Sequence, residues 1–529
     1  MQRPFPWEGL YPPGTDWGAP VETSTLPELL ARSVGRFADE PALLFQATRW
    51  DYRTFAAHVD RLAAGLIAAG LRPGDRVALH LPNTLTHPLS FFGVLRAGGI
   101  VTHLTPLDPL RTLQRKIADV GARFLIATDL PNLREISEKL DVEQRFISRE
   151  AAWLDGGALG LPDAAPLSEW PALVAEDIAL LQFTGGTTGH PKAAKLSHAN
   201  LSAATSIYTN WNAAFGRRVQ PGERSLLVLP LFHIFALTSV MVRALAGGAE
   251  LLIHARFDAE AVLDAIERDR VTLMSGVPTM WTALSRSPSI DKRDLSSLKA
   301  VFSGGAPLPV DIAERIEALT GHRLGGGWGM TETSPTGTNL IPGSLNVPGG
   351  IGVPLPGIEL RIVDPTDPAR ELPQGEIGEM AIRGPNVTPG YWNRPEDNAR
   401  AFVGSFFLTG DLGQMQPDGT FVLVDRKKDM ILSGGFNVYP RVIEEAIGEH
   451  PDVTEVAVIG VDDEYRGQSA KAFVSLRPGA DVLTLDVLRA FLADKLGRHE
   501  MPTQLEIRAA LPKTPVGKLS RQELRESAP

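Results

Sequence analysis

The strongest constraint on the fold is a repeated alternation of short apolar runs with stretches of helical periodicity. Short apolar runs predict buried strands, and apolar residues three and four positions apart predict helices. Strands that alternate with helices form a doubly wound, largely parallel sheet, which binds ligands at the carboxyl ends of its strands. The predicted strands lie at 76–81, 99–103 and 123–128, and the predicted helices at 26–37, 54–69, 87–97, 110–120 and 133–140.

The same layout returns between residues 225 and 332. Predicted strands there again run into loops of small or functional residues. One such loop is unremarkable, but several at strand ends argue for a composite site built from converging loops. The loops lie at 230–238, 303–308 and 325–332.

From about residue 346 the pattern changes to alternation typical of β-strands, with a predicted hairpin turn at Asp418-Gly419. A charged run at 425–429 follows, and beyond it a compact α+β unit of domain size is expected. The sequence therefore predicts an α/β fold with two domains, at 1–427 and 428–529.

Composition and charge exclude several functions. The chain has no cysteine, so disulfides, thiol nucleophiles and cysteine-ligated metals are excluded. A net charge of −10 argues against a nucleic-acid-binding surface. The long apolar window 226–242 is interrupted by Pro230 and His233, so we expect no transmembrane segment. A cytoplasmic location is the default expectation, with peripheral membrane contact and a homodimer left open.

The segment 178–192 indicates a polyphosphate-binding loop. An apolar run ending at Phe183 enters a loop of hydroxyls and glycines that closes on Lys192. Glycines allow the backbone N–H groups to approach an anion, and hydroxyls and a lysine add donors. The spacing does not fit a Walker A motif, and a mobile surface loop with a solvated lysine is the alternative. The candidate residues are Thr184, Gly185, Gly186, Thr187, Thr188, Gly189 and Lys192.

Seven ordered motifs, at 184–192, 230–235, 303–308, 328–332, 409–411, 426–435 and 512–518, resemble those of the acyl-adenylate-forming superfamily. This superfamily includes acyl-CoA synthetases, firefly-type luciferases and peptide-synthetase adenylation domains. The resemblance covers nearly the whole chain and is strongest to fatty-acid–CoA ligases. It implies that a carboxylate attacks the α-phosphate of ATP, with Mg²⁺ bound, to give an acyl-adenylate and pyrophosphate. Coenzyme A then displaces AMP.

The resemblance also implies a nucleotide site. The loop after Phe183 would hold the β- and γ-phosphates, Thr331 would contact the α-phosphate, and Glu332 would bind Mg²⁺. Trp328, where the family usually has tyrosine, would stack on adenine, and Asp411 would accept hydrogen bonds from the ribose. Further nucleotide- or acyl-site residues would be Gly304, Gly305, Ala306, Pro307, Gly327, Gly329, Met330 and Arg426. Taken singly, Glu332 and Asp411 would more often be a surface acid and a turn residue.

Other roles follow from the same resemblance. Lys518 would be the lysine that the small, mobile domain delivers for adenylation only. Lys428 would be the hinge between the domains, although a solvated linker charge is a serious alternative. Gly434 and Gly435 would line the coenzyme A tunnel, with Arg256 a weaker candidate for the coenzyme A phosphates. His233 would border the carboxylate pocket, with a core or capping histidine as the alternative.

Departures from the family pattern are informative. Serine is commoner at Gly185, glycine at Ala193 and lysine at Leu432, whose change removes a cation near the coenzyme A step. No aspartate stands near His233 to pair a substrate amine, which favours a plain carboxylic acid. We expect a medium- or long-chain fatty acid, with aryl, alicyclic and dicarboxylic acids open. A different acyl acceptor and a non-catalytic binding protein are the rival functions.

Overall fold

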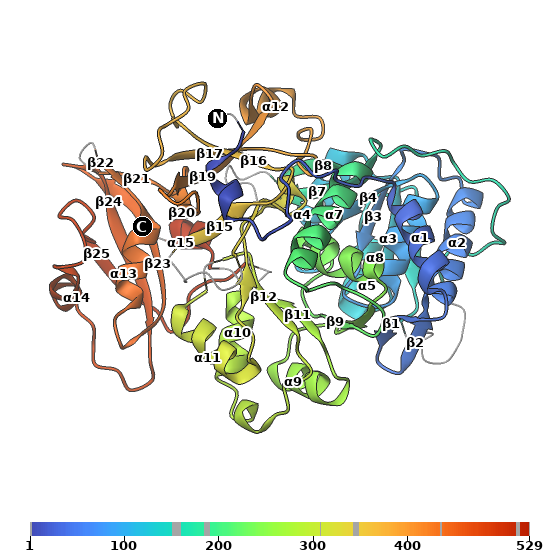
Figure 1. The fold of residues 1–529 in the computed structure, drawn as a ribbon, viewed down its shortest axis with the longest axis horizontal. Coiled ribbons are helices and arrows are strands. Elements are labelled where there is room, and N and C mark those ends of the chain that lie inside the picture. Colours follow the sequence, from blue (N-terminus) through green and yellow to red (C-terminus); the bar gives the residue numbers. More distant parts are fainter. Residues whose placement is uncertain are drawn as a thin grey trace.

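Parallel sheets dominate the first three hundred residues of the chain (Figure 1). The computed structural model describes residues 3–150, 160–184, 191–306, 308–341, 349–433, 436–514 and 519–527. The first sheet has the order β6 (Gln144–Ser148), β5 (Phe124–Thr128), β3 (Arg76–His80), β4 (Ile100–His103), β7 (Ile178–Thr184), β8 (Lys192–Ser197). All of its neighbouring strands are parallel except β7 and β8, which are antiparallel. The predicted phosphate loop therefore connects the two strands of a hairpin.

The second sheet continues the alternation but begins with strands from the N-terminus. Its order is β13 (Gly325–Gly326), β12 (Ala300–Ser303), β11 (Leu273–Gly276), β9 (Arg224–Leu227), β10 (Glu250–Ile253), β1 (Pro41–Phe45), β2 (Thr48–Asp51). Strand β1 pairs in parallel with β10, in the register Leu43 with Leu251. Sequence periodicity did not predict the pairing of β1 with β10, because periodicity carries no information on which strands pair.

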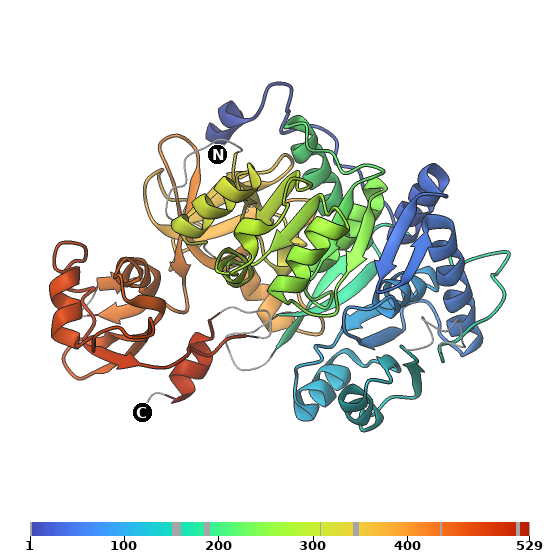
Figure 2. The same cartoon turned by 90° about the horizontal axis from the view of Figure 1, so that it is seen from below.

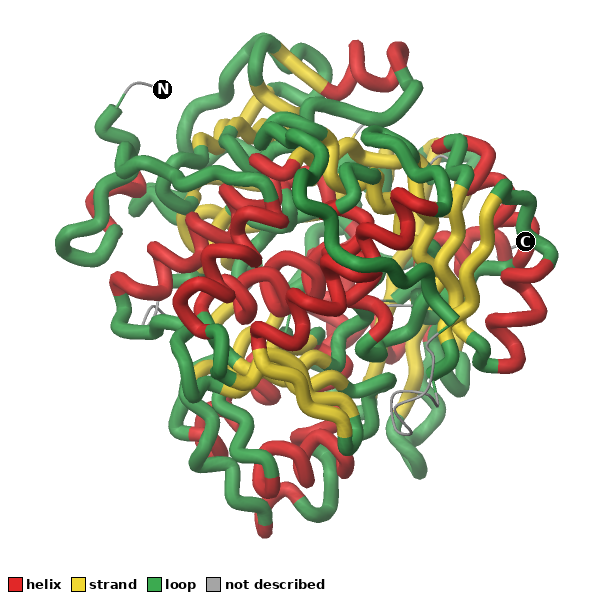
Figure 3. The backbone as a smooth tube through the Cα atoms, turned by 90° about the vertical axis from the view of Figure 1, so that its right-hand side faces the viewer, coloured by secondary structure: helices red, strands yellow, loops and turns green. Residues whose placement is uncertain are grey.

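Helices pack between and outside these two sheets, as the tube view shows (Figure 3). The predicted helices are present with small shifts of their ends. Thr25 caps the first helix. Its side chain accepts a hydrogen bond from the Glu28 N–H, and the Glu28 side chain accepts one from the Thr25 N–H. The helices are α1 (Leu26–Phe37), α2 (Tyr52–Ala68), α3 (Thr86–Arg96), α4 (Leu110–Val120), α5 (Pro131–Glu138), α7 (His198–Ala214), α8 (Arg243–Gly247), α9 (Ala259–Arg268), α10 (Pro278–Ser285) and α11 (Val310–Thr320).

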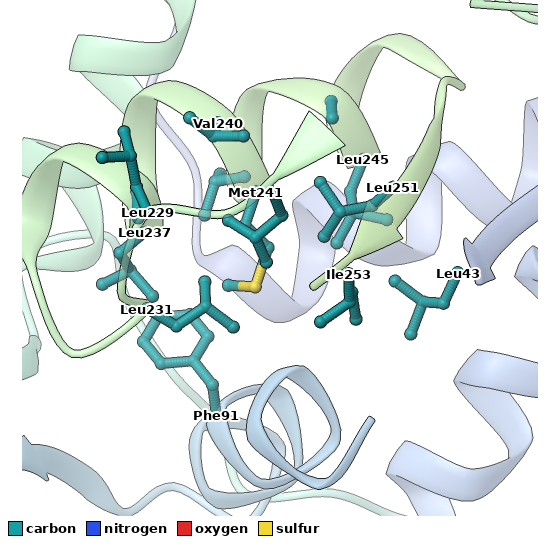
Figure 4. Close-up of a cluster of buried hydrophobic side chains, with 14 of the residues drawn as sticks. Leu43, Phe91, Leu229, Leu231, Leu237, Val240, Met241, Leu245, Leu251 and Ile253 are labelled. Carbon is teal, nitrogen blue, oxygen red and sulfur yellow. The ribbon is translucent and has the colours of Figure 1, made fainter. Parts of the chain in front are cut away.

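A π-helix, η2 (Phe235–Val242), continues directly into α8 and borders the core. One of its faces carries Leu237 and Met241, which point with Leu245 toward Phe91 of α3 and Leu43 of β1 (Figure 4). None of the helices formed by the described residues is long and apolar enough to cross a membrane.

The β-rich part and the C-terminal unit follow as predicted. The third sheet has the order β14 (Thr338–Asn339), β15 (Gly350–Pro354), β20 (Phe421–Arg426), β19 (Phe406–Met415), β17 (Gly378–Arg383), β16 (Glu359–Val363), with β18 (Phe402–Val403) beside β19 and α12 (Pro395–Ala401) before it. The predicted hairpin turn joins β19 to β20, with Gly419 at φ +91°.

The last hundred residues form a five-stranded sheet with its own apolar core, seen as a separate lobe in Figure 2. Its order is β22 (Phe436–Val438), β21 (Ile431–Ser433), β24 (Gly467–Leu476), β23 (Val453–Asp463), with β25 (Gln504–Ile507) beside β24. Its helices are α13 (Pro440–Gly448), α14 (Leu485–Leu492) and α15 (Arg521–Ser527), of which α15 was not predicted. The predicted α/β fold class is confirmed.

Candidate active site

Several predicted site residues lie outside the described residues, and their roles stay predictions. They are Gly185, Gly186, Thr187, Thr188, Gly189, Pro307, Gly434, Gly435 and Lys518. Most of the remaining candidates fall into four groups that the fold positions separately.

The first group surrounds the carboxylate of Glu332. Glu332 is 4% exposed and lies in the short turn Thr331–Thr333, and the Tyr391 hydroxyl donates to its Oε1 at 2.8 Å. Lys192 begins β8, lies 5.4 Å from the centre of the Tyr391 ring, and pairs with Asp397 at 2.5 Å between Nζ and Oδ1. Residues 388–392 create this arrangement by joining β8 to the turn. The Thr388 backbone N–H donates to the Glu332 carbonyl, and Tyr391 forms an isolated antiparallel β-bridge with Ala194 of β8.

The electrostatics of this group suit a bound cation. Burial raises the pKa of Glu332 above its ordinary value, although the Tyr391 hydroxyl stabilises the charged form. A hard divalent cation at Glu332 would offset that desolvation, and one carboxylate with substrate oxygens is an ordinary Mg²⁺ ligand set. The described residues contain no cluster of three or more potential metal ligands, so the other ligands would come from phosphates and water.

The second group links Trp328 with Asp411 and Arg426. The Trp328 indole Nε1 donates to Asp411 Oδ2 at 2.8 Å, and Arg426 Nε lies 3.1 Å from Asp411 Oδ1. Asp411 and Arg426 face each other in the β19–β20 register. Trp328 is 6% exposed, so its ring lies mostly in the core and its polar edge is committed to the carboxylate. Each carboxylate oxygen has a second lone pair, which leaves acceptor capacity for the ribose hydroxyls.

Glycines allow the chain to pass close to its neighbours around Trp328. A Cβ at Gly329 would lie 1.7 Å from the Pro335 carbonyl oxygen, and one at Gly327 would lie 2.1 Å from the Thr338 oxygen. Larger residues at 327 and 329 would displace the segment that carries Trp328, Met330 and Thr331. The glycines are thus explained by backbone approach within the protein.

The third group positions His233. The loop before η2 is held by two buried side chains. Asn83 donates to the Leu229 carbonyl and accepts from the Leu231 N–H, both at 2.9 Å, and Gln182 of β7 donates to the Phe232 carbonyl at 2.9 Å. His233 is half-buried beside them, and its Nδ1 accepts the Phe235 N–H at 3.4 Å.

Gln182 is itself fixed by buried histidines. Its Oε1 lies 3.0 Å from His103 Nδ1, and His103 Nε2 lies 3.2 Å from His87 Nε2. Burial lowers the pKa of His103 to about 4 and that of His87 well below its ordinary value. Both rings are therefore neutral positioning groups under the loop. At the strand end nearby, Gly304 packs against Phe235, whose Cζ would lie 3.1 Å from an added Cβ.

The fourth group spans the predicted hinge. Arg521 of α15 contacts Asp425 at 3.2 Å, Asp429 at 3.1 Å and Glu444 at 2.5 Å. Arg525 also pairs with Asp429, at 2.7 Å. Although burial raises the pKa of Asp429, the Arg521 and Arg525 guanidinium groups keep it below its ordinary value. Lys428 lies beside this network with its residue surface exposed overall, and partial desolvation together with the neighbouring arginines lowers its pKa.

Not every predicted residue joins a group. Arg256 is exposed, and no described residue pairs with it. Thr184 and Lys192 face each other across the hairpin, with Thr184 Oγ1 donating to the Lys192 carbonyl at 3.4 Å. The sequence reading missed Tyr391, Asp397 and Arg521, because nothing in their local patterns distinguishes them from ordinary turn and helix residues.

Comparison with known proteins agrees with the motifs. Residues 30–392 match the family described as AMP-binding enzyme, and residues 442–518 match the AMP-binding enzyme C-terminal domain. A long-chain-fatty-acid–CoA ligase of Bacillus subtilis (strain 168) is 36% identical over 99% of this chain and 98% of its own. A feruloyl-CoA synthase of an Amycolatopsis species is 37% identical over 90% of this chain and 94% of its own.

Solved structures show the same architecture. ATP-bound MatB from Rhodopseudomonas palustris superimposes with a TM-score of 0.83 at 30% identity, over 95% of this chain and 98% of that chain. The chain therefore belongs to the AMP-binding enzyme family and is a ligase of the AMP-forming acyl-CoA synthetase class.

Proposed function

We propose that the chain activates a carboxylic acid with ATP and transfers the acyl group to coenzyme A. In the first step a carboxylate oxygen forms a bond to the α-phosphorus, and the bond to pyrophosphate breaks. In the second step the coenzyme A sulfur attacks the acyl carbon, and AMP leaves with the bonding electrons. The observation that carries the proposal is the pair of neighbouring groups, Glu332–Tyr391 and Trp328–Asp411–Arg426, whose carboxylates are buried.

The nucleotide would lie between these groups. Asp411 would accept the ribose hydroxyls, and Lys192 would exchange Asp397 for a departing phosphate. Mg²⁺ at Glu332 would supply charge stabilisation for the pentacoordinate transition state. Trp328 supports this arrangement mainly by orienting Asp411, and the predicted stacking of its ring on adenine stays a prediction.

The first half-reaction would also need Lys518, delivered by the unit that begins near Lys428. Arg521 supports this role, because it lies three residues after Lys518 and binds Asp425 and Glu444, which precede and follow Lys428 in the sequence. We propose that rotation near Lys428 then exposes the acyl-adenylate to coenzyme A. The domain boundary at 427/428, the homodimer and the cytoplasmic location also remain predictions.

The acid is a separate question. The name of the Bacillus relative supports a fatty acid, and the feruloyl-CoA synthase supports an aryl acid as the alternative. No aspartate lies in the His233 loop, which supports a substrate without an amino group.

The test measures AMP and pyrophosphate release from a panel of fatty, dicarboxylic and aryl acids, with and without coenzyme A. Lys518→Ala should lose acyl-adenylate formation but convert supplied acyl-adenylate to the thioester. Lys513→Ala is the matched control, because Lys513 lies on the same segment and pairs with Glu455. If Lys518→Ala forms acyl-adenylate at the parent rate, its proposed role is wrong. If no acid supports AMP release, the proposed function is wrong.

A further inference from the structure

Arg243, the first residue of α8, is a buried cation for which the described part of the chain supplies no anion. It is 8% exposed, and no described residue forms an ion pair or hydrogen bond with its guanidinium. Its neighbours are the Phe302 ring, 5.3 Å from its Cζ to the ring centre, and Tyr208. Arg521 is also largely buried but contacts three carboxylates. A buried, uncompensated charge is strongly unfavourable, and arginine remains charged in proteins.

The helix geometry connects Arg243 with the acyl end of the site. Phe235, at the start of η2, packs on Gly304, whereas Arg243, eight residues later, lies over Phe302. The helix therefore runs back along β12, away from the strand's carboxyl end. At the helical rise, Arg243 lies at most roughly 12 Å along the axis beyond Phe235. The opposite helix face, with Leu237 and Met241, is buried in the core (Figure 4).

The surroundings of Arg243 add a buried polar group for which the described residues supply no partner. The Ser239 hydroxyl, one turn earlier on the helix, is buried, and no described residue bonds it. Tyr208 of α7, whose hydroxyl interacts with Thr336, lies close enough to Arg243 to feel its charge. A helix face that contacted only a saturated hydrocarbon chain would not carry an unbonded hydroxyl, since a buried polar atom costs free energy unless it is hydrogen-bonded.

A small cavity beside Phe302 has the same character. It contains two further arginines, Arg217 and Arg323, and no acidic residue. Its lining is Trp211, Asn212, Arg217, Phe302, Arg323, Leu324, Gly325, Asn339, Leu340 and Ile341. Phe302 thus contacts Arg243 and also lines a cavity that has two arginines and no carboxylate among its described lining residues.

We propose that Arg243 binds a second carboxylate at the far end of the substrate, so that the enzyme acts on a medium-chain dicarboxylic acid. The reacting carboxylate lies at the Gly304 end and the distal one at the Phe302 end. This inference rests on the proposed function for the reaction, and it adds the substrate class.

The test compares octanoic, octanedioic and omega-hydroxyoctanoic acids, which share a chain length. In the unaltered protein kcat/KM for octanedioic acid should exceed that for octanoic acid by about tenfold or more, because a site built for a polar group rejects the analogue that lacks it. Arg243→Leu should lower kcat/KM for octanedioic acid by about tenfold or more and leave octanoic acid unchanged or better. Arg243→Lys should keep part of the preference. Arg286→Leu, at an exposed arginine after α10, is the control and should change nothing.

Binding without catalysis provides a second readout. Calorimetric titration with octanedioic acid in the absence of ATP should show binding that Arg243→Leu abolishes, whether or not any acid is turned over. The proposal is overturned if Arg243→Leu, folded by circular dichroism, affects the three acids equally, or if the unaltered protein prefers octanoic or omega-hydroxyoctanoic acid. A protein that turns over octanoic acid and ignores octanedioic acid keeps the proposed function and rejects this inference alone.

Discussion

Replacing Trp328 by phenylalanine tests whether the indole acts through Asp411. The change keeps an aromatic ring and removes one 2.8 Å hydrogen bond to a buried carboxylate. Hydrogen bonds to charged groups contribute about 1.5–3 kcal/mol, so the free energy of unfolding should fall by that amount. The hydrogen bond is lost whether or not ATP is bound, so only part of its energy should appear in ATP binding. If about 1.4 kcal/mol is lost because Asp411 is less well oriented, the KM for ATP should rise about tenfold.

The assay separates this effect from stacking by using 2′,3′-dideoxy-ATP, which has no ribose hydroxyls for Asp411 to accept. Trp328→Phe should raise the KM for ATP and have a much smaller effect on the KM for the dideoxy analogue. Trp17→Phe is the matched control. The Trp17 indole donates to the neutral Ile358 carbonyl at 2.8 Å, so its loss should cost only about 1 kcal/mol and leave the KM for ATP unchanged.

A double-mutant cycle that combines Trp328→Phe with Asp411→Asn tests whether the two residues act through their shared hydrogen bond. Residues that share one hydrogen bond should show a coupling of about 0.5–3 kcal/mol in stability. Additive effects would refute the link between Trp328 and Asp411. Equal increases in KM for ATP and its dideoxy analogue would show that the ring acts by stacking alone.

Three further outcomes are expected. Burial raises the pKa of Glu332, so its protonation competes with Mg²⁺ as the pH falls toward that raised value, and the apparent Mg²⁺ affinity should weaken there. In a pH series of initial rates, Glu332→Gln should abolish this pH dependence of Mg²⁺ affinity and most of the activity. Arg521→Ala removes the cation paired with Asp425 and Glu444, while Arg525 still pairs with Asp429. The change should cost about 3–5 kcal/mol of stability of the C-terminal unit, measured by urea unfolding, and slow adenylation more than thioester formation. Equal slowing of both steps would argue against a role in placing Lys518. Gln182→Leu removes the donor to the Phe232 carbonyl and should raise the KM for the acid while sparing the KM for ATP; an unchanged acid KM would show that the His233 loop holds itself.

Much of the fold could be predicted from local patterns, because periodicity and capping are local properties. The helix Leu26–Phe37 and the turn at Asp418-Gly419 appear as predicted. Strand pairing could not be obtained in this way, since the parallel contact of β1 with β10 depends on tertiary packing. The helix α15 was missed because its short sequence lies behind a segment rich in proline and glycine.

The site divides along a similar line. Motif residues such as Glu332 and Asp411 could be singled out from the sequence, and the structure places them in neighbouring buried groups. The partner of Glu332 could not be predicted, because Tyr391 comes from a segment with no distinctive spacing. The most informative residue for the acid, Arg243, is ordinary in sequence and becomes unusual only because it is buried with no counterion among the described residues.

The pairing of β1 with β10 has a consequence for how the chain is made. Leu43 emerges from the ribosome long before Leu251, so the second sheet stays open at this strand until most of the large parallel part has been synthesised. Contacts between segments so distant in sequence slow folding and leave strand edges exposed in the meantime. A nascent fragment ending before β10 should therefore be sensitive to proteolysis and dependent on chaperones, and dividing the chain between its two parallel sheets should not yield independently folding halves.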